Sequence, residues 1–535
     1  MTKSENRLRR LGASSKLVAL AGLFKLVALA GLFKFVALAG LLTCAWSSPS
    51  VCGIVGHVST SPVNQQIYDS LLLLQHRGQD SSGIATADGD TFHIAKVKGQ
   101  VREGYRTRDM RNLLGNVGLG HVRYATAGSA KSDDEVQPFY VNAPYGIVLV
   151  HNGNLTNTRE LRKELFNVDR RHLNSSSDTE LLLNVLANEL QHGINGDELT
   201  PDNLFDSISR LHDRVEGSYA SVALISGYGL LAFRDPFGIR PLVLGRRDDE
   251  HGRDEWVVAS ESLVLESGGY DLVRDVEPGE AIFITAGGEL FSRQCAVNPR
   301  LVPCSFEYVY LARPDSVMNG ISVYESRLRM GKTLAANVER SISAGDIDVV
   351  MPIPDSGRPT AMEMAKTLGI DYREGFYKNR YVGRTFIMPG QKVRKKSVRQ
   401  KLNALPTEFR GKNVLLVDDS IVRGTTSKEI VEMARQAGAN SVTFASAAPP
   451  VRYPHVYGIN MPSRGELVAS GRSIEEIASV ISADRLVYQE VGDLFTAITE
   501  GSNVKELDMS CFDGNYVTGT VTPEYLAWLE LNTKS

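Results

Sequence analysis

The chain has 535 residues, of which 42% are hydrophobic and 23% are charged, as is ordinary for a globular enzyme. This composition excludes a wholly disordered, collagen-like or multi-spanning membrane protein, and the length allows two or more large domains. The formal net charge of −3 means that no overall field draws the chain to nucleic acid or anionic lipid. Five widely spaced cysteines without a CxxC pair predict neither a disulfide framework nor a zinc site, and they favour a reducing compartment such as the cytoplasm.

Residues 1–51 differ in sequence pattern from the rest of the chain. After a basic start, residues 16–42 hold three near-identical copies of a nine-residue unit, KLVALAGLF. A targeting segment or pro-segment fits a basic start followed by an apolar run, but Lys25 and Lys34 leave apolar stretches too short to span a bilayer. We therefore expect a misplaced start, in which tandem-repeated DNA upstream of Val51 is translated, with a targeting or pro-segment as the alternative.

The next region, residues 52–290, is rich in short apolar runs separated by glycine turns, which predicts layered sheets with helices outside. Helices are expected at Asn64–Gln75 and Thr179–Leu190. The stretch Gly287–Pro303 contains Gly, Pro and Asn and is interpreted as a linker. The expected strands are Gly118–Tyr124, Gly146–His151, Tyr219–Ile225, Leu230–Phe233, Trp256–Ala259 and Ala281–Thr285.

Residues 305–500 alternate strands with helices, which predicts an α/β domain with a mostly parallel sheet. Residues 501–535 form a C-terminal tail with a final helix at Pro523–Leu531. The strands expected in the α/β domain are Asp348–Pro352, Val414–Val417 and Ser441–Ala447, and the helices are Arg358–Leu368 and Ser427–Ala437.

The string VLLVDDSIVRGTTS, residues 414–427, predicts an anion site. An apolar strand ends in Asp418 and Asp419, and a loop of small and hydroxyl residues leads into a helix. Free N–H groups in such a loop and at the helix N-terminus attract phosphate. The acids lie at the carboxyl end of the strand, where α/β sheets bind ligands, and could hold ribose hydroxyls directly or through Mg²⁺.

This string resembles the signature with which type I phosphoribosyltransferases bind phosphoribosylpyrophosphate (PRPP). The resemblance implies that Asp418 and Asp419 face the ribose and one Mg²⁺ per subunit. The loop MPIPDSGRPTA, residues 351–361, then grips pyrophosphate, with Ser356 as a third contact to the metal. The residues implied in PRPP binding are Asp355, Ser356, Gly357, Asp418, Asp419, Ser420, Arg423, Gly424, Thr425, Thr426 and Ser427.

The stretch Phe376–Lys401 holds nine basic residues and no acid, with helix-breaking Gly and Pro. Such a run is often a solvated face or a nucleic-acid patch. Because it lies between the two anion-binding loops in sequence, we interpret it as a lid over pyrophosphate that includes Lys378 and Arg384 and excludes water. A nucleic-acid patch is the less favoured alternative.

Cys52 opens the string CGIVG, which precedes a β-compatible run. A cysteine at the start of a chain has an α-amine with a pKa near 8 beside its thiol, and that amine can act as the base that activates the nucleophile. Taken alone, Cys52 reads more simply as an ordinary buried cysteine.

Four further strings change this interpretation: QHRGQDSSG (75–83), GHVRYAT (120–126), HNGNLTN (151–157) and SSSDTE (175–180). Together with CGIVG they resemble class II glutamine amidotransferase domains, which have an α+β N-terminal-nucleophile (αββα) fold. The resemblance implies that Cys52 attacks the glutamine amide and that the Asn152 side chain and the Gly153 N–H form the oxyanion hole. It also implies that Arg123 binds the substrate carboxylate and Asp178 its ammonium group. The residues His76, His121 and His151 are expected to be structural.

The whole of residues 52–535 resembles the amidophosphoribosyltransferase family, most closely its proteobacterial subgroup without an iron–sulfur cluster. The resemblance implies transfer of ammonia from glutamine to PRPP, the first step of purine synthesis, in a homotetramer inhibited by purine nucleotides. No iron–sulfur cluster is expected, since His455 replaces a cysteine and Cys511 stands without a close partner cysteine. The alternatives are an ammonia-dependent transferase with a silent glutaminase, or a PRPP- or nucleotide-sensing regulator.

Overall fold

The computed structural model describes residues 52–123, 135–193, 199–378, 402–459, 461 and 463–532. The expectations for residues 1–51 and for most of the basic stretch, including Arg384, therefore lie outside the described residues. Within the described ranges, no helix has the length and apolar character needed to cross a membrane.

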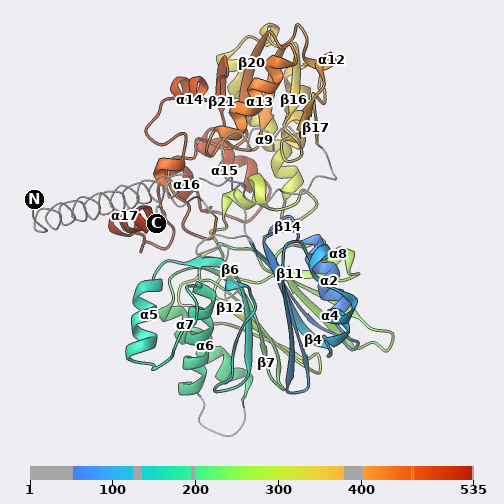
Figure 1. The fold of residues 1–535 in the computed structure, drawn as a ribbon, viewed down its shortest axis with the longest axis vertical. Coiled ribbons are helices and arrows are strands. Elements are labelled where there is room, and N and C mark those ends of the chain that lie inside the picture. The colour runs from blue at the N-terminus through green and yellow to red at the C-terminus, as the bar shows by residue number, and fades with distance from the viewer. Residues whose placement is uncertain are drawn as a thin grey trace, which may run out of the picture. The chain divides into compact units, whose positions relative to one another are not determined.

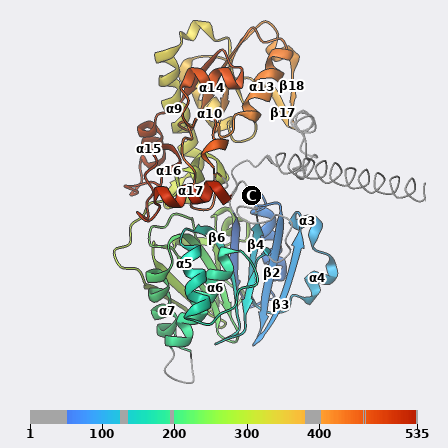
Figure 2. The ribbon, with the colours of Figure 1, turned by 60° about the vertical axis from the view of Figure 1, so that its left-hand side comes forward.

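The N-terminal part of the chain folds into two packed sheets (Figures 1 and 2). The first has seven antiparallel strands in the order β11-β9-β10-β1-β4-β2-β3. Their bounds are β1 Gly53–Val58, β2 Ser81–Asp88, β3 Thr91–Lys98, β4 Val117–Arg123, β9 Val243–Asp248, β10 Asp254–Ala259 and β11 Asp271–Asp275.

The second sheet has six strands in the order β13-β12-β8-β7-β6-β5, also antiparallel. Apolar side chains from both sheets, among them Ile54, Val148 and Val222, form one buried cluster, so the sheets pack face to face. The strand bounds are β5 Phe139–Val141, β6 Ile147–Leu155, β7 Gly217–Ile225, β8 Gly229–Arg234, β12 Glu280–Thr285 and β13 Leu290–Gln294.

Helices cover the outer face of each sheet, which completes four layers in the order αββα. Helices α2 (Asn64–Leu73) and α8 (Leu263–Ser267) pack on the first sheet. Helices α5 (Thr158–Asn167), α6 (Asp178–Gly193) and α7 (Pro201–Arg214) pack on the second. Short helices α3 (Val101–Gly104) and α4 (Thr107–Asn112) follow β3. This part of the chain, residues 52–294, is called the sandwich below.

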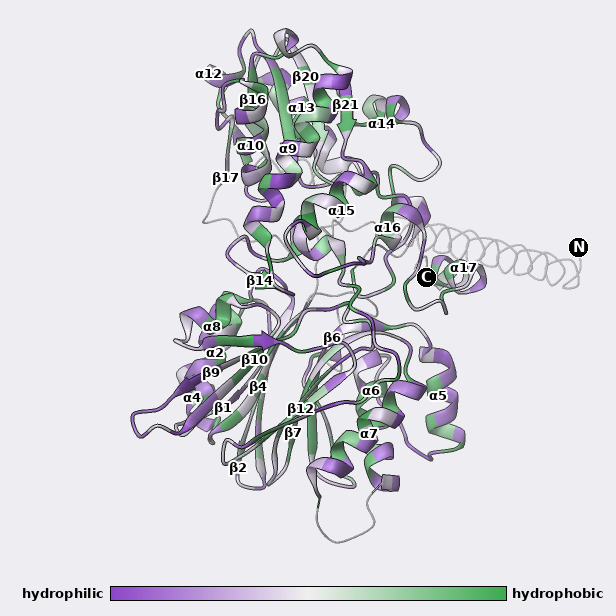
Figure 3. Cartoon of the chain, turned by 180° about the vertical axis from the view of Figure 1, so that it is seen from behind, coloured by the Kyte–Doolittle hydropathy of each residue, from purple (hydrophilic) through white to green (hydrophobic). Residues whose placement is uncertain are grey.

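The C-terminal part contains a four-stranded parallel sheet in the order β16-β19-β20-β21. Its strands are buried along nearly their whole length because helices cover both faces (Figure 3). The bounds are β16 Val349–Pro352, β19 Asn413–Asp418, β20 Ser441–Ser446, β21 Arg485–Tyr488, α9 Val323–Ser341, α10 Arg358–Leu368, α13 Thr425–Gln436, α14 Ile474–Ile481 and α15 Val491–Thr499. This part, residues 305–512, is called the parallel-sheet region.

Smaller elements complete the fold. Strands β17 (Phe376–Lys378) and β18 (Leu402–Ala404) pair as an antiparallel ribbon on either side of the basic stretch. The chain ends with α16 (Ser510–Asp513) and α17 (Pro523–Asn532). The remaining elements are a π-helix at Glu307–Leu311, 3₁₀ turns at Ala344–Asp346 and Arg464–Glu466, strands β14 (Val317–Met318) and β15 (Ile321–Ser322), and helix α12 (Pro406–Phe409).

The predicted linker Gly287–Pro303 is wrong at its N-terminal end. Gly288 closes a turn after β12, and Leu290–Gln294 forms β13, which pairs with β12 in register from Glu280 to Ile284. The glycines therefore mark a hairpin turn and not the end of the domain. The predicted C-terminal tail is likewise more integrated than expected. Cys304 and Asp508 pair in a β-bridge, and Leu507, Met509, Cys511 and Phe512 lie in the same buried cluster as Phe306.

Candidate active site

Cys52 lies at the amino end of β1, directly before Gly53. It is buried, with 9% of its surface exposed. Gly53 pairs with Val122 of β4, so the register brings Cys52 and Arg123 to the same end of the sheet. The Ile54 N–H donates to Ser260 Oγ and the Ser260 N–H donates to the Ile54 carbonyl, each at 3.0 Å. The predicted nucleophile is thus fixed by a central strand that is held on both sides.

Asn152 and Gly153 lie in β6 of the second sheet. The Asn152 side chain is fully buried, and neither its amide nitrogen nor its oxygen has a hydrogen-bond partner among the described residues. A buried amide without a partner costs free energy, so such a group is typical of a site that is completed by a ligand. Gly153 has φ +155°, and a Cβ there would lie 2.0 Å from the Ser218 carbonyl oxygen. Both features fit donors reserved for an oxyanion.

Arg123, at the end of β4, is held by two acids that the sequence analysis did not identify. One guanidinium nitrogen is 2.8 Å from a Glu135 carboxylate oxygen and another is 3.4 Å from Asp80. Ser176 donates to the other Glu135 oxygen. Burial raises the pKa of Asp80, and Arg123 opposes that rise. The arrangement orients the guanidinium, which is the group expected to bind the substrate carboxylate.

Asp178 begins α6 and lies near the same strand end as Asn152. Its carboxylate accepts a hydrogen bond of 3.2 Å from the Leu155 N–H and lies 3.9 Å from His151 Nδ1. The Asp178 side chain is 23% exposed, so it retains access for an ammonium group. The structure therefore places Asp178, Asn152 and Gly153 around β6.

The three histidines make structural contacts or are buried without charge. His76 Nε2 lies 2.7 Å from Glu261, and His151 contacts Thr179 Oγ1 and the Ser218 carbonyl, both at 3.3 Å. Burial, followed by the charge of Arg123, holds the pKa of His121 well below its usual range. Their interpretation as structural residues fits these surroundings.

Two acids at the end of β19 lie beside a serine from the loop that follows the neighbouring strand, β16. Asp418 and Asp419 are buried, with 9% and 7% exposed. Ser356, in the loop after β16, donates to Asp419, and Ser420 Oγ donates to the same carboxylate at 2.6 Å. Because β16 and β19 are parallel neighbours, their carboxyl ends meet at one sheet edge. The three residues predicted to bind the metal are therefore together.

The environment of these acids favours a cation. Burial, and then Asp419, raises the pKa of Asp418 well above its usual range, and burial also raises the pKa of Asp419. Burial lowers the pKa of the nearby Arg327 guanidinium to about 10, and Asp419 opposes this shift. Two carboxylates and a hydroxyl are hard oxygen donors of the kind that Mg²⁺ prefers. The residues present thus fit the metal that the resemblance implies.

The predicted phosphate loop follows Asp419 and leads into α13. Gly424 precedes this twelve-residue helix, Thr425 and Thr426 are exposed in its first turn, and Ser427 is buried. Arg423 pairs with Glu466 at 2.8 Å. The helix N-terminus and the exposed hydroxyls present donors to an anion.

The predicted pyrophosphate loop packs on β19 and contacts the base of the basic stretch. A Cβ on Gly357 would lie 2.5 Å from the Val417 carbonyl oxygen, so the loop lies close against the strand. Asp355 accepts from Lys378 Nζ at 2.6 Å and from Arg358 at 3.0 Å. Lys378, the described member of the predicted lid, is therefore at the pyrophosphate loop.

Comparison with known proteins agrees with this arrangement. A model of the glutamine amidotransferase domain matches residues 121–267, and a model of the phosphoribosyl transferase domain matches residues 323–455. The amidophosphoribosyltransferase of Pseudomonas aeruginosa is 56% identical over 481 residues, which cover 90% of this chain and 95% of that protein. The chain belongs to the amidophosphoribosyltransferase family.

Two solved structures of the family share the fold. The glutamine phosphoribosylpyrophosphate amidotransferase from Bacillus subtilis, complexed with ADP and GMP, is 36% identical with a TM-score of 0.77, covering 88% of this chain and 98% of its own. A structure of "the allosteric regulatory enzyme of purine biosynthesis" is also 36% identical, with a TM-score of 0.78 and coverage of 88% and 97%. The fold is thus an α+β N-terminal-nucleophile domain followed by an α/β type I phosphoribosyltransferase domain, as predicted.

Some members of this family hold an iron–sulfur cluster, which needs four thiolates. Here Cys304, His455 and Asp508 are buried with their ligand atoms within 4.8 Å of one another. His455 Nδ1 accepts from the Tyr457 N–H at 3.2 Å, so Nε2 carries the ring proton and faces Cys304 at 3.4 Å and Asp508 at 3.3 Å. Burial and the nearby Asp508 raise the pKa of Cys511. This donor set does not fit a four-thiolate cluster.

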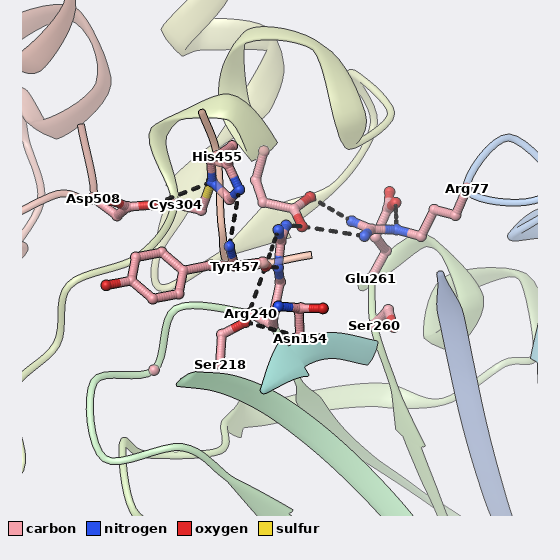
Figure 4. A network of polar contacts seen from close by, with 12 residues as sticks. Arg77, Asn154, Ser218, Arg240, Ser260, Glu261, Cys304, His455, Tyr457 and Asp508 are labelled. Atoms are coloured by element: carbon pink, nitrogen blue, oxygen red, sulfur yellow. Dashed lines mark hydrogen bonds and ion pairs between the residues drawn. The ribbon is translucent and has the colours of Figure 1, made fainter. Parts of the chain in front are cut away.

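A buried charge network joins the sandwich to the parallel-sheet region of this family member (Figure 4). Arg77 pairs with Glu261 and, at 2.8 Å, with Glu307. Arg240 pairs with Glu307 at 3.0 Å and donates to the Tyr457 carbonyl at 2.7 Å. Of these residues only Arg77 lies in a motif singled out in the sequence, QHRGQDSSG, and no role was predicted for Arg77, Arg240 or Glu307. Nothing in a linear string shows that charges so far apart in sequence meet in the interior.

Proposed function

We propose that this chain transfers ammonia from glutamine to PRPP, releasing 5-phosphoribosylamine, pyrophosphate and glutamate, the first step of purine biosynthesis. Two features of the same chain carry the proposal. One is the buried Asn152 amide, which has no partner among the described residues and lies in the sheet that packs on the sheet of Cys52. The other is the buried pair Asp418 and Asp419, which precedes the predicted phosphate loop. The first is a glutaminase feature and the second a phosphoribosyltransferase feature. Neither half alone accounts for both.

The sandwich supplies the nitrogen. With Cys52 as the first residue, its α-amine takes the thiol proton and the thiolate attacks the glutamine amide carbon. Asn152 Nδ2 and the Gly153 N–H donate to the oxygen that becomes negatively charged. Arg123 and Asp178 hold the α-carboxylate and α-ammonium of the substrate. The α-amine then returns the thiol proton to the departing nitrogen, so that collapse of the tetrahedral intermediate expels ammonia. Water then hydrolyses the thioester to glutamate.

The parallel-sheet region supplies the acceptor. Thr425, Thr426 and Ser427, with Ser420, Arg423 and Gly424, hold the 5′-phosphate at the N-terminus of α13, and the loop of Asp355, Ser356 and Gly357 holds pyrophosphate. Ser356, Asp418 and Asp419 would bind one Mg²⁺, which when bound neutralises charge on the diphosphate. Lys378 and Arg384 belong to the proposed lid. Ammonia attacks C1 of the ribose from the face opposite the pyrophosphate.

Family membership also supports several proposals about the whole protein. We place it in the cytoplasm as a homotetramer without an iron–sulfur cluster. Feedback by purine nucleotides is supported by the ADP and GMP bound to the Bacillus subtilis enzyme. The proposed domains are 52–290 and 305–500, with a C-terminal tail 501–535, the first domain extending to Gln294 to include β13.

The proposed function is tested with Cys52→Ala. We expect glutamine-dependent pyrophosphate release to fall about 10³-fold or more, because the nucleophile is lost, while release with ammonium chloride as nitrogen source is retained. Cys295→Ala, at a second buried cysteine directly after β13, is the matched control and should keep both activities.

Two outcomes would contradict the proposal. Unchanged glutamine use by Cys52→Ala would exclude the assigned nucleophile, and no pyrophosphate release by the wild-type chain with either nitrogen source would indicate a regulator. N-terminal sequencing of the native protein completes the test, since an N-terminus at Cys52 supplies the base. Wild-type activity with ammonia alone would indicate a silent glutaminase.

A further inference from the structure

A segment of the parallel-sheet region, residues 447–459, runs from the acid pair to the proposed oxyanion strand. We call it the bridging segment. At its start, the Ala447 N–H donates to the Asp418 carbonyl at 2.9 Å and the Ala448 N–H to the Asp419 carbonyl at 2.8 Å. Pro449 and Pro450 follow, whose rings fix φ. One end of the segment is therefore tied to the backbone of the predicted Mg²⁺ ligands.

The other end of the bridging segment lies against β6. Asn154 Nδ2 donates to the Val456 carbonyl at 2.8 Å, and Ser218 Oγ donates to the Tyr457 carbonyl at 2.9 Å. Ser218 Oγ in turn lies 3.3 Å from the Asn154 N–H, from which it accepts. Figure 4 shows Asn154 and Ser218 beneath Tyr457. On the bridging segment, the acceptors of both side-chain hydrogen bonds are main-chain carbonyl groups.

Gly458 makes the closest approach. Its φ is +100°, and a Cβ there would lie 2.8 Å from both the carbonyl carbon and the carbonyl oxygen of Gly153. Backbone cannot yield to such a contact as the end of a flexible side chain can. Gly153 is the residue whose N–H is assigned to the oxyanion, and Asn152 precedes it in the same strand. The main chain of the C-terminal region thus packs directly on the proposed oxyanion hole.

We propose that the bridging segment is a positioning element for the oxyanion hole, with Gly458 and Asn154 as positioning residues. The inference rests on the proposed function and deepens it. An oxyanion donor works only where it meets the developing charge, and loss of one such donor costs about 10²–10³ in kcat. The geometry of ammonia release in the sandwich is therefore set by a segment anchored at the PRPP loop.

Gly458→Ala tests this proposal. The added Cβ displaces Gly153, so we expect glutamine-dependent kcat to fall at least about tenfold, given what a lost donor costs. The KM for glutamine should change less than twofold, and the ammonia-dependent rate should stay within twofold. Gly471→Ala is the matched control, because Gly471 also has a positive φ, +69°, but its Cβ would meet nothing within 4 Å. It should leave all three quantities unchanged.

A second measurement separates positioning from a general structural effect. The γ-aldehyde analogue of glutamine forms a thiohemiacetal: the Cys52 sulfur bonds to the carbonyl carbon, and the thiol proton passes to the oxygen that occupies the oxyanion hole. Its inhibition constant should rise in Gly458→Ala by the same factor as kcat falls. Glutamate, which forms no such adduct, should bind as it does to the wild type.

The outcomes distinguish this inference from the proposed function. A wild-type chain that releases no pyrophosphate with either nitrogen source contradicts the proposed function. An active wild type with normal glutamine-dependent kcat in Gly458→Ala overturns the positioning role alone, as does an equal loss of ammonia-dependent activity. If Gly458→Ala does not fold, Asn154→Ala takes its place with the same expected pattern. This variant removes the 2.8 Å bond to the Val456 carbonyl together with a 3.2 Å bond to the neighbouring Leu155 carbonyl.

Discussion

Asp419 shows how the interior prepares a residue for a ligand. It accepts from Ser356 and Ser420, yet burial still raises its pKa, with Ser356, Ser420 and Arg327 opposing the rise. The pKa of Asp419 in the folded state lies above the ordinary value. At pH values between these two pKa values, the metal-free folded chain binds more protons than the unfolded chain. The stability of the folded chain therefore falls as pH rises through this range. A divalent cation relieves this cost by neutralising the carboxylates.

Asp419→Asn is expected to separate ligand binding from stability. Loss of an outer-shell partner alone costs about 10–100-fold in metal affinity, so losing a proposed ligand should weaken Mg²⁺-dependent PRPP binding by more than this, as measured by calorimetry. Without metal, the variant should melt no lower than the wild type at pH 8, and its melting temperature should fall less as pH rises.

Asp371→Asn, at an exposed ion pair with Arg373, is the control for this experiment and should leave both quantities unchanged. Wild-type PRPP affinity in Asp419→Asn would contradict the assigned role of Asp419.

The residues proposed to carry the chemistry were easier to single out in the sequence than the residues that surround them. Asp418, Asp419, Cys52 and Asn152 stand in strings that could be read from the sequence. Their supporting residues, such as Arg327 beside Asp419 or Glu135 beside Arg123, become neighbours only through tertiary packing. A contact between residues on different elements leaves no local pattern.

At the scale of elements, the crossing of α9 and α10 controls where the predicted pyrophosphate loop ends. A Cβ on Gly331 of α9 would lie 2.4 Å from the Thr360 carbonyl oxygen, in the first turn of α10. Thr360 Oγ1 also donates to the Arg327 carbonyl at 3.2 Å. Since Gly357 immediately precedes α10, a shift of this helix moves the loop that we propose holds pyrophosphate.

Gly331→Ala should therefore affect both stability and PRPP use. We expect a loss of about 1–3 kcal/mol in the free energy of unfolding, as is typical of overpacking, and a raised KM for PRPP with ammonia as nitrogen donor. Urea unfolding and steady-state kinetics measure the two effects.

Gly492→Ala, in α15, is the comparison for this variant, because its Cβ would meet nothing within 4 Å and alanine favours helix. It should be neutral or slightly stabilising. A Gly331→Ala variant with unchanged stability and KM would show that the crossing tolerates a methyl group.

Some elements were predicted with their bounds and others were missed, among them the long helices α7 and α9. The helix at Arg358–Leu368 has the predicted bounds. The hairpin of β2 and β3 was not predicted. β3 alternates exposed and partly buried residues at the sheet edge, and β2 is buried but has the sequence SSGIATAD, which is no continuous apolar run. β13 was taken as linker for the same reason, since none of its residues is fully buried. Edge strands carry a weaker apolar signal than central ones.

At the scale of the whole molecule, buried charges hold the sandwich and the parallel-sheet region together. Glu261 contacts Arg77, lies 2.7 Å from His76, and accepts from Ser316 Oγ at 2.6 Å and the Arg313 N–H at 3.0 Å. Burial alone would raise the pKa of Glu261, but Arg77 and His76 outweigh it and hold that pKa well below its usual range. Glu261 therefore stays ionised in the interior.

Glu261→Gln should destabilise the chain in a pH-dependent manner. Breaking a buried pair costs about 3–5 kcal/mol because it leaves an uncompensated charge. Here Arg77 and Arg240 would be left to share the single carboxylate of Glu307. A depressed pKa contributes stability that is fully present above the unfolded value of about 4.3 and is lost as pH falls below it. The difference from wild type should therefore be largest at pH 7 and shrink towards pH 4, as measured by urea unfolding.

Glu506→Gln, at a half-exposed pair with Arg300, is the control and should cost at most about 1 kcal/mol. A difference between Glu261→Gln and wild type that does not change with pH would show that the carboxylate contributes by packing and not by charge.

The close fit of Gly458 on Gly153 limits how the two catalytic parts can be recombined. A chimera that joins this glutaminase to the transferase of a distant relative would place a foreign main chain on the strand of Asn152. In such an enzyme, glutamine hydrolysis should be poorly coupled to phosphoribosylamine formation, even if each part folds. Glutamine would be hydrolysed without product, or little product would be made. Grafting residues 447–459 together with the glutaminase donor is the exchange that should preserve the junction.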